Sequence, residues 1–322
     1  MKLYLAPLEG ITTYIYRNAF HRLFGSSVDK YFAPFLMPHI KRDMNFKEKK
    51  DLIPENNTGI PLIPQLLTDQ AEDFLRYEKI LQDMGYDEIN INFGCPSGTV
   101  ASKGRGAGFL ARKEELDVFL EKVYTDKTGR VSVKTRLGIE DPEEFYEILE
   151  IYNKYPMEEL IIHPRVQKEQ YKGLPHRDIF LYALKNSRNP LVYNGDIRNE
   201  KDLYLLQSQA KTYTPDMNFD LMIGRGAIAD PSIFRRIRSF LNGQKSDRIT
   251  ESELTDLLLE VEMAYTAVLS GDTQVLFRLK ELWTWLIGLF PENEKVLKKL
   301  LKCKNLQEFH VLQKSLIETL PK

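Results

Sequence analysis

The feature that most constrains the fold of this chain is a repeated alternation of short apolar runs and helical patterns. Eight strand-like runs occur within residues 1–243, and helical patterns follow nearly all of them. Such a repeat is typical of a (β/α)8 TIM barrel, in which the carboxyl ends of all strands meet at one mouth. The predicted strands are residues 2–6, 28–35, 60–67, 86–93, 130–135, 159–163, 191–193 and 220–223.

A doubly wound sheet is the alternative fold, but two observations favour the barrel. A doubly wound sheet normally carries a GxGxxG first turn, and residues 6–12 do not fit that pattern. Polar or unusual residues also stand at the strand ends throughout. A barrel gathers those ends at one mouth, whereas an open sheet spreads them along an edge. They are Pro7 to Glu9, Gln65, Asn92, Lys134, His163, Asn194 and Gly224-Arg225.

Local signals divide the chain further. Pro61 and Pro64 weaken the third predicted strand, because each proline removes a donor from the sheet. Asp141 followed by Pro142 predicts a helix that starts at that point. After residues 242–244 the pattern becomes helical only. We therefore predict a barrel domain over 1–243 and a small helical domain over 249–322.

Composition excludes several classes of protein. Two cysteines, with no CxxC pair and no histidine-rich cluster, argue against a disulfide framework and a metal site and favour a reducing cytoplasm. No apolar run reaches membrane-spanning length, and the run before Pro7 is too short for a signal peptide. The formal net charge of −1 means that a nucleic-acid surface must be a local basic patch. We expect a cytoplasmic monomer without a metal.

Cys95 is the candidate catalytic residue. A lone cysteine is most simply a small buried hydrophobe. Cys95, however, follows a predicted strand end, precedes Pro96 and lies before a glycine-rich loop over residues 103–108, so the barrel fold places it at the mouth. There a thiol can donate a proton or act as a nucleophile. A nucleophile needs a nearby base, and His163 is the only histidine at a predicted strand end. We interpret Cys95 as a catalytic acid.

The remaining strand ends indicate a phosphorylated cofactor. Lys134 alternates with valines on its strand and is expected to project into the mouth. The loops at Asn194-Gly195-Asp196 and Gly224-Arg225-Gly226 follow the seventh and eighth strands, where barrels commonly bind phosphate. A flavin mononucleotide (FMN) fits this set, because Lys134 near the N1–C2 carbonyl would stabilise the reduced ring.

Several motifs together resemble those of the tRNA-dihydrouridine synthases, over residues 4 to about 235. The most specific are the Gly-Cys-Pro-Ser loop, the Lys-x-Arg-x-Gly run and the Ile-Gly-Arg-Gly run. The full set comprises residues 6–12, 65–67, 92–97, 104–108, 133–136, 162–165, 171–173, 194–196 and 223–226. The chain departs from the pattern at Leu8, where Met is more usual, and at Asn90, where Asp is frequent.

The resemblance implies an FMN-dependent oxidoreductase that reduces the C5–C6 bond of uridine in tRNA to 5,6-dihydrouridine, with NADPH as reductant. It implies that Cys95 is the proton donor and that Asn92 and Arg136 lie near the target base. The residues expected to hold FMN are Pro7, Leu8, Glu9, Gln65, Lys134, His163, Asn194, Gly195, Asp196, Gly224 and Arg225.

Two other functions remain open at this point. One is an FMN barrel reductase that acts on a small molecule such as a free pyrimidine, and the other is a tRNA-binding protein without activity. The helical tail and the basic clusters favour tRNA over a small substrate. These clusters are Lys41, Arg42, Lys47, Lys49 and Lys50; Lys103 and Arg105; Arg235, Arg236 and Arg238; and Lys298, Lys299, Lys302 and Lys304.

Overall fold

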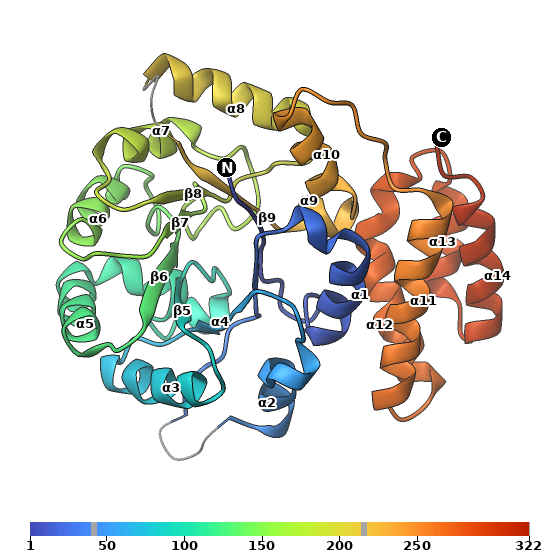
Figure 1. Ribbon diagram of the computed structural model, residues 1–322, viewed down its shortest axis with the longest axis horizontal. Coiled ribbons are helices and arrows are strands. Elements are labelled where there is room, and N and C mark those ends of the chain that lie inside the picture. The colour runs from blue at the N-terminus through green and yellow to red at the C-terminus, as the bar shows by residue number, and fades with distance from the viewer. Residues whose placement is uncertain (40–43, 214–217, 322) are drawn as a thin grey trace.

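A computed structural model describes residues 1–39, 44–213 and 218–321 of the chain. Parallel strands form a barrel with helices outside it, and four further helices follow at the C-terminal end (Figure 1), which confirms the predicted fold class. The strands are β1 (Leu3–Leu5), β2 (Lys30–Phe32), β3 (Leu62–Ile63), β4 (Gln65–Leu66), β5 (Glu88–Phe93), β6 (Arg130–Thr135), β7 (Leu160–Ile162), β8 (Leu191–Tyr193) and β9 (Asp220–Ile223).

The nine strands occupy eight positions around the barrel, because the third predicted strand is divided at Pro64 into β3 and β4. β3 pairs with β2 and β4 pairs with β5, and all pairs are parallel in the order β3-β2-β1-β9-β8-β7-β6-β5-β4. The two ends of this order are one continuous stretch of chain, so the sheet closes on itself. An isolated parallel bridge between Leu36 and Leu66 completes the seam. Pro64 therefore interrupts the hydrogen bonding of the third predicted strand but does not change its position in the barrel.

The barrel interior is apolar on one side and polar on the other. An interior cluster of Tyr4, Phe32, Ile161, Val192 and Met222 comes from β1, β2 and β7 to β9. The strands β4 to β6 instead carry polar residues. Their register pairs Gln65 with Asn90, Asn90 with Ser132, and Asn92 with Lys134, so these side chains point the same way.

Helices cover the outside of the barrel. The α-helices are α1 (Tyr14–Phe24), α2 (Phe46–Leu52), α3 (Ala71–Asp83), α4 (Gly98–Ala101), α5 (Lys113–Asp126), α6 (Glu144–Tyr152), α7 (Arg177–Asn186), α8 (Glu200–Tyr213), α9 (Arg225–Ala229) and α10 (Ile233–Leu241). Short 3₁₀ turns are η1 (Gly25–Ser27), η2 (Pro54–Asn56), η3 (Gly106–Ala111) and η4 (Ile287–Leu289). The apolar faces of the longer helices pack on the sheet as one continuous core.

One predicted helix starts later than expected, and α7 is among the helices that the sequence did not predict. α6 begins at Glu144 rather than at Pro142, because the Glu144 carboxylate accepts hydrogen bonds from the backbone amides of Ile139, Glu140 and Asp141. Residues 141–143 therefore form a turn ahead of the helix. α7 was not predicted at all. It starts after His176, which makes no side-chain capping hydrogen bond, so its start carries no capping signal in the sequence.

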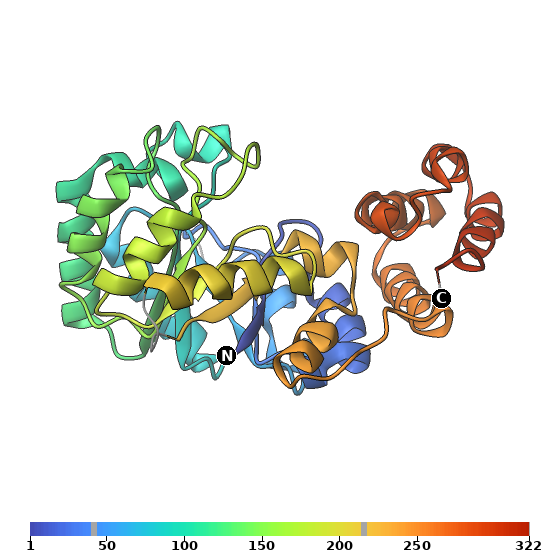
Figure 2. The same ribbon diagram turned by 90° about the horizontal axis from the view of Figure 1, so that it is seen from above.

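The C-terminal helices form a separate layer beside the barrel (Figures 1 and 2). They are α11 (Glu251–Val268), α12 (Asp272–Leu286), α13 (Glu294–Lys302) and α14 (Leu306–Ile317). Thr250 and Glu253 form a capping box at the start of α11. α11 packs on α1, and α12 packs on α9 and reaches the loop after β1, where a Cβ on Gly10 would lie 3.5 Å from Glu281 Oε1.

No helix within the described residues combines the length and the apolar character needed to cross a membrane. The boundary between a barrel domain and a helical domain, predicted near residues 243–249, stays a prediction.

Candidate active site

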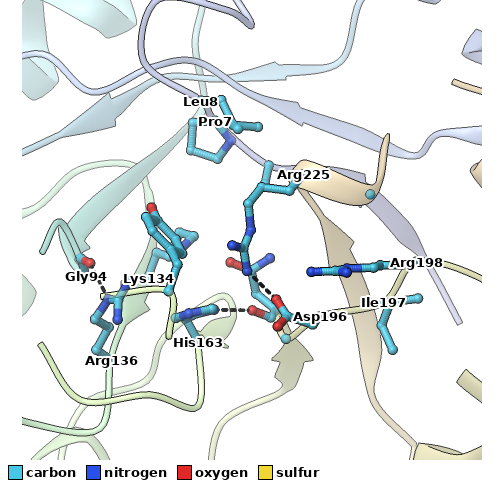
Figure 3. A pocket seen from close by; sticks show the side chains of 16 residues that line it. Pro7, Leu8, Gly94, Lys134, Arg136, His163, Asp196, Ile197, Arg198 and Arg225 are labelled. Atoms are coloured by element: carbon cyan, nitrogen blue, oxygen red, sulfur yellow. Dashed lines mark hydrogen bonds and ion pairs between the residues drawn. The ribbon is translucent and has the colours of Figure 1, made fainter. Parts of the chain in front are cut away.

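A cavity opens at the carboxyl ends of the strands, where the barrel fold predicts the active site (Figure 3). Its walls come from the loops after β1, β5, β7, β8 and β9 and from the end of β6. The lining residues are Ala6, Pro7, Leu8, Gly94, Lys134, Arg136, His163, Tyr171, Asn194, Gly195, Asp196, Ile197, Arg198, Gly224, Arg225 and Gly226.

Most of the residues expected at the site line this one cavity, and four do not. Glu9 is exposed on the loop after β1, and Gln65 is fully buried inside the barrel below the mouth. Asn92 and Cys95 flank Gly94, which does line the cavity. Those that line it are Pro7, Leu8, Lys134, Arg136, His163, Asn194, Gly195, Asp196, Gly224 and Arg225. The roles assigned to all of them stay predictions.

Lys134 supplies a cation that has no partner in the protein. Its ammonium makes no hydrogen bond or ion pair within residues 1–39, 44–213 and 218–321, and it faces the cavity. Burial, together with the nearby charge of Arg136, lowers the pKa of Lys134 to about 7. An anion or a polarised carbonyl bound in the cavity would reverse this shift. The residue is therefore placed to respond to a ligand rather than to another side chain.

Arg136 is held in place by backbone carbonyl groups. Its Nε donates to Gly94 O and one Nη donates to Val166 O, each over 3.0 Å, and only 1% of the residue is exposed. Burial lowers the pKa of Arg136 to about 10. Arg136 therefore stays charged at neutral pH and ties the loop of Cys95 to the loop after β7.

His163 is fixed as a neutral imidazole. Its Nδ1 lies 2.5 Å from Asn194 O, and a carbonyl oxygen only accepts, so Nδ1 carries the proton and Nε2 is unprotonated. Burial, then the charges of Arg136 and Lys134, hold the pKa of His163 well below its usual value. Asn194 in turn donates from Nδ2 to Met222 O over 2.9 Å, so His163 is supported from β9.

Asp196 is shared by two arginines. The buried Arg165 donates to Asp196 Oδ2 over 2.6 Å, and Arg225 pairs with Oδ1. Burial alone would raise the pKa of Asp196, but the hydrogen bonds from Arg165 and the charge of Arg225 hold it below its usual value. Arg198 is different, since its guanidinium has no ion pair or hydrogen bond within the described chain and points toward the cavity (Figure 3).

A loop after β7 covers part of the mouth and was not assigned a role from the sequence. Arg165 holds it by donating to Lys172 O and Gly173 O. The Tyr171 ring lies 4.5 Å from the guanidinium carbon of Arg225 and 5.3 Å from that of Arg136. The Tyr171-Lys172-Gly173 run was quoted only as a motif. Arg165 was quoted only as part of the motif over residues 162–165, and Arg198 was not singled out at all, because the partners and surroundings of both residues come from distant strands.

Cys95 lies at the edge of the cavity in its protonated form. Burial raises the pKa of its thiol above the usual range, which favours proton donation over attack as a thiolate. The glycine-rich loop packs directly on it. Ala107 N donates to Cys95 O over 3.0 Å, and a Cβ on Gly106 would lie 2.9 Å from the same oxygen. Asp69 ties this loop down through Arg105 and Arg112.

The predicted basic clusters differ in whether their side chains are paired with acidic residues or exposed without a partner. Lys41 and Arg42 lie outside the described residues. The arginines of α10 are paired with acids, and Arg238 also donates to Met1 O, at the end of the barrel away from the mouth. The cluster on α13 stays exposed: Lys299 and Lys302 have no ion-pair partner in the described chain, whereas Lys298 pairs with Glu294. Among the described side chains, no group of His, Cys, Asp and Glu is arranged to hold a metal.

Fold and site together define a barrel enzyme with a cationic active-site cavity at the carboxyl ends of its strands. The family model described as dihydrouridine synthase (Dus) matches residues 4–320. The chain belongs to this family. It is a tRNA-dihydrouridine synthase and hence an oxidoreductase of a flavin-dependent family, as the motifs led us to expect.

Individual relatives agree with this assignment. A probable tRNA-dihydrouridine synthase of Staphylococcus aureus strain COL is 29% identical over 272 residues, covering 79% of this chain and 74% of the relative. The protein of the same name from strain MRSA252 is 30% identical over 250 residues, covering 72% and 70%. A tRNA-dihydrouridine(16) synthase of Cupriavidus necator is 26% identical over 252 residues, covering 77% and 76%.

Proposed function

We propose that the cavity binds FMN, with NADPH as the reductant, and that Cys95 protonates a tRNA uridine held beside the flavin. The observation that carries this proposal is the cavity itself. It gathers the unpaired ammonium of Lys134, the unpaired guanidinium of Arg198 and two glycine loops, and it lies next to a protonated thiol. A phosphate and an electron-accepting ring are the two chemical groups that this set suits.

The phosphate end belongs to the loops after β8 and β9. Gly195 and Gly224 leave the backbone accessible there, and side chains are restricted: a Cβ on Gly224 would lie 3.2 Å from Ala6 Cβ. Arg165 and Arg225 share the single negative charge of Asp196, and Arg198 adds a guanidinium that has no acidic partner within the described residues. We assign Arg198 as an additional ligand of the cofactor phosphate.

The ring end belongs to Lys134 and His163. With its pKa near 7, Lys134 gains a proton readily when negative charge develops on a neighbouring ring. His163 is neutral, and its unprotonated Nε2 accepts from Arg165 Nη1 over 3.4 Å, so it borders the ring without adding charge. Bound FMN would supply the hydride that adds to C6 of the uracil.

Cys95 completes the reduction. After hydride addition to C6, negative charge spreads from C5 to the C4 carbonyl of the uracil. The Cys95 thiol then gives its proton to C5, the product is 5,6-dihydrouridine, and solvent returns a proton to the thiolate. The raised pKa keeps the thiol protonated until this step. Arg136, which is fixed on Gly94 O, is placed to hold the base near Cys95.

The tRNA itself would contact the exposed lysines of α13. A uridine inside folded tRNA must leave its stack to reach the mouth, so we expect a flipped base. Lys299 and Lys302 offer unpaired charge for the phosphate backbone, as required for salt-dependent binding. The monomeric state and the cytoplasmic location expected from the sequence stay predictions.

The direct test supplies the purified protein with FMN, NADPH and either unmodified tRNA or free uridine, and measures dihydrouridine by mass spectrometry. We expect dihydrouridine in tRNA only. Product from free uridine alone would support the small-molecule reductase. A protein that takes up no FMN and forms no product would support the binding protein without activity.

A further inference from the structure

A line of hydrogen-bonded amides leads from the barrel interior to the loop of Cys95. Asn92 Oδ1 accepts from the backbone amides of Gly94 and Cys95, each over 2.9 Å. A backbone N–H only donates, so the oxygen of the Asn92 side chain must face this loop. Its Nδ2 must then point inward, toward the barrel axis.

The orientation of Asn92 sets the orientation of the next side chains. Asn92 Nδ2 donates to Gln65 Oε1 over 2.6 Å, and Gln65 Nε2 donates to Asn90 Oδ1 over 2.7 Å. Asn90 Nδ2 then donates to Ser132 Oγ over 2.9 Å. Donor and acceptor therefore alternate in one direction along the whole line.

All members of this line are shielded from water. Gln65, Asn90 and Ser132 are fully buried, and Asn92 is 6% exposed. Gln65, Asn90 and Ser132 are also register partners on β4, β5 and β6, so the barrel fixes their spacing. A reversed amide anywhere would place two donors or two acceptors face to face without water to relieve them.

We propose that Asn90 is a positioning residue for Cys95. By accepting from Gln65 Nε2, it keeps Gln65 Oε1 facing Asn92, and Asn92 then holds the amides of Gly94 and Cys95. Asn90 lies two residues deeper on β5 than Asn92 and does not line the cavity. The proposal relies on the proposed function only for the role of Cys95 as proton donor.

Position 90 requires an acceptor toward Gln65 and a hydrogen-bonding group toward Ser132. Asp meets both requirements, because one oxygen accepts from Gln65 Nε2 and the other accepts from the Ser132 hydroxyl. Leu has a similar volume but meets neither. N90D and N90L therefore differ in the orientation that they impose on Gln65, while both change the same buried site.

The experiment measures alkylation of Cys95 by iodoacetamide in the full-length protein, resolved by peptide mass spectrometry so that the buried Cys303 is counted separately. Dihydrouridine formation in tRNA is measured in parallel. T135V is the matched control, since Thr135 is a fully buried hydroxyl residue on the neighbouring strand β6 whose Oγ1 bonds Tyr152 and Arg136 O, outside the amide line.

We expect N90L to raise the alkylation rate about tenfold, the change that the loss of one buried hydrogen bond typically produces, and to lower turnover. N90D should restore both values to within about threefold of the native protein, and T135V should lower the melting temperature without changing the alkylation rate. Native alkylation in N90L would overturn the proposal. Equal changes of alkylation rate and turnover in N90D and N90L would also overturn it, because the hydrogen-bond acceptor toward Gln65 would then have no effect on Cys95. Since alkylation requires no turnover, a failure of the proposed enzymatic function is seen separately.

Discussion

Arg165 donates a 2.6 Å hydrogen bond to Asp196 Oδ2 from a fully buried position in the loop after β7. Arg165 and Arg225 together neutralise the negative charge of Asp196, so that this carboxylate has no charge left for Arg198. The guanidinium of Arg198 is left uncompensated at the same cavity wall (Figure 3). The loops after β8 and β9 therefore carry surplus positive charge where a cofactor phosphate would lie.

Arg198→Gln should weaken FMN binding by about ten- to a hundredfold, because a hydrogen bond to a charged group typically contributes about 1.5–3 kcal/mol. Riboflavin, which has no phosphate, should bind the variant and the native protein equally. Flavin fluorescence titration measures both constants. Arg188→Gln is the matched control, since this exposed arginine precedes β8 at the opposite end of the barrel. Equal losses for FMN and riboflavin would contradict the assignment.

Lys134→Met should stabilise the flavin-free protein at low pH. The unfolded chain protonates Lys134 below about pH 10.4, whereas the folded chain does so only below about 7. Between these values the unfolded state binds more protons, so the stability of the native protein rises with pH across this window. The variant lacks this contribution. Its stability advantage should be largest near pH 6 and disappear toward pH 10.

Urea denaturation of both flavin-free proteins from pH 6 to 10 measures this difference. FMN should abolish the advantage at pH 7, because the bound ring gives the Lys134 charge a partner. A difference between the two proteins that stays constant over the whole pH range would mean that Lys134 does not carry the shifted pKa.

Gly106→Ala should disturb Cys95, and Gly243→Ala should not. Both glycines have positive φ, +55° and +69°, so alanine costs roughly 1–2 kcal/mol of backbone strain at either site. Only at Gly106 would the added Cβ meet Cys95 O, at 2.9 Å, whereas nothing lies within 4 Å at Gly243. Both variants should lose stability through backbone strain, and Gly106→Ala should lose more because of its clash with Cys95. A loss of turnover is expected in Gly106→Ala only. Full turnover in Gly106→Ala would show that this contact does not position Cys95.

The lysines of α13 should control the affinity for tRNA. Replacing both Lys299 and Lys302 by Gln is expected to weaken binding and to reduce the slope of log K against log salt by about 1 for each lysine that contacts a phosphate. A control variant with Lys79→Gln and Lys201→Gln removes the same charge from the barrel helices α3 and α8. Equal slopes in the two variants would exclude α13 as the contact surface.

The strand order and the mouth were predictable from the sequence because both depend on local patterns. Each apolar run ends at a polar residue, and parallel strands bring those ends together, so Lys134, His163 and Asn194 could be assigned to one site before any coordinates. Local signals also explain the errors. Pro64 splits the third predicted strand in two but leaves it at the same position in the barrel. The hydrogen bonds of the Glu144 carboxylate make α6 begin at residue 144 instead of 142.

What the sequence did not predict depends on contacts between distant strands. Asn90 was recognised as a departure from related proteins, but its partners Gln65 and Ser132 lie 25 and 42 residues away and become neighbours only through the barrel register. The same holds for Arg165 and Asp196, 31 residues apart. Amphipathic periodicity and turn signals contain no information on such pairs.

The most direct test of the account is Cys95→Ala, assayed for bound flavin and for dihydrouridine formed in unmodified tRNA. We expect FMN to bind as in the native protein, because Cys95 does not line the cavity, and product formation to fall by about 10²–10⁴-fold, the usual contribution of a general acid. Native product formation by the alanine variant with FMN bound would contradict the assignment of Cys95 as the proton donor.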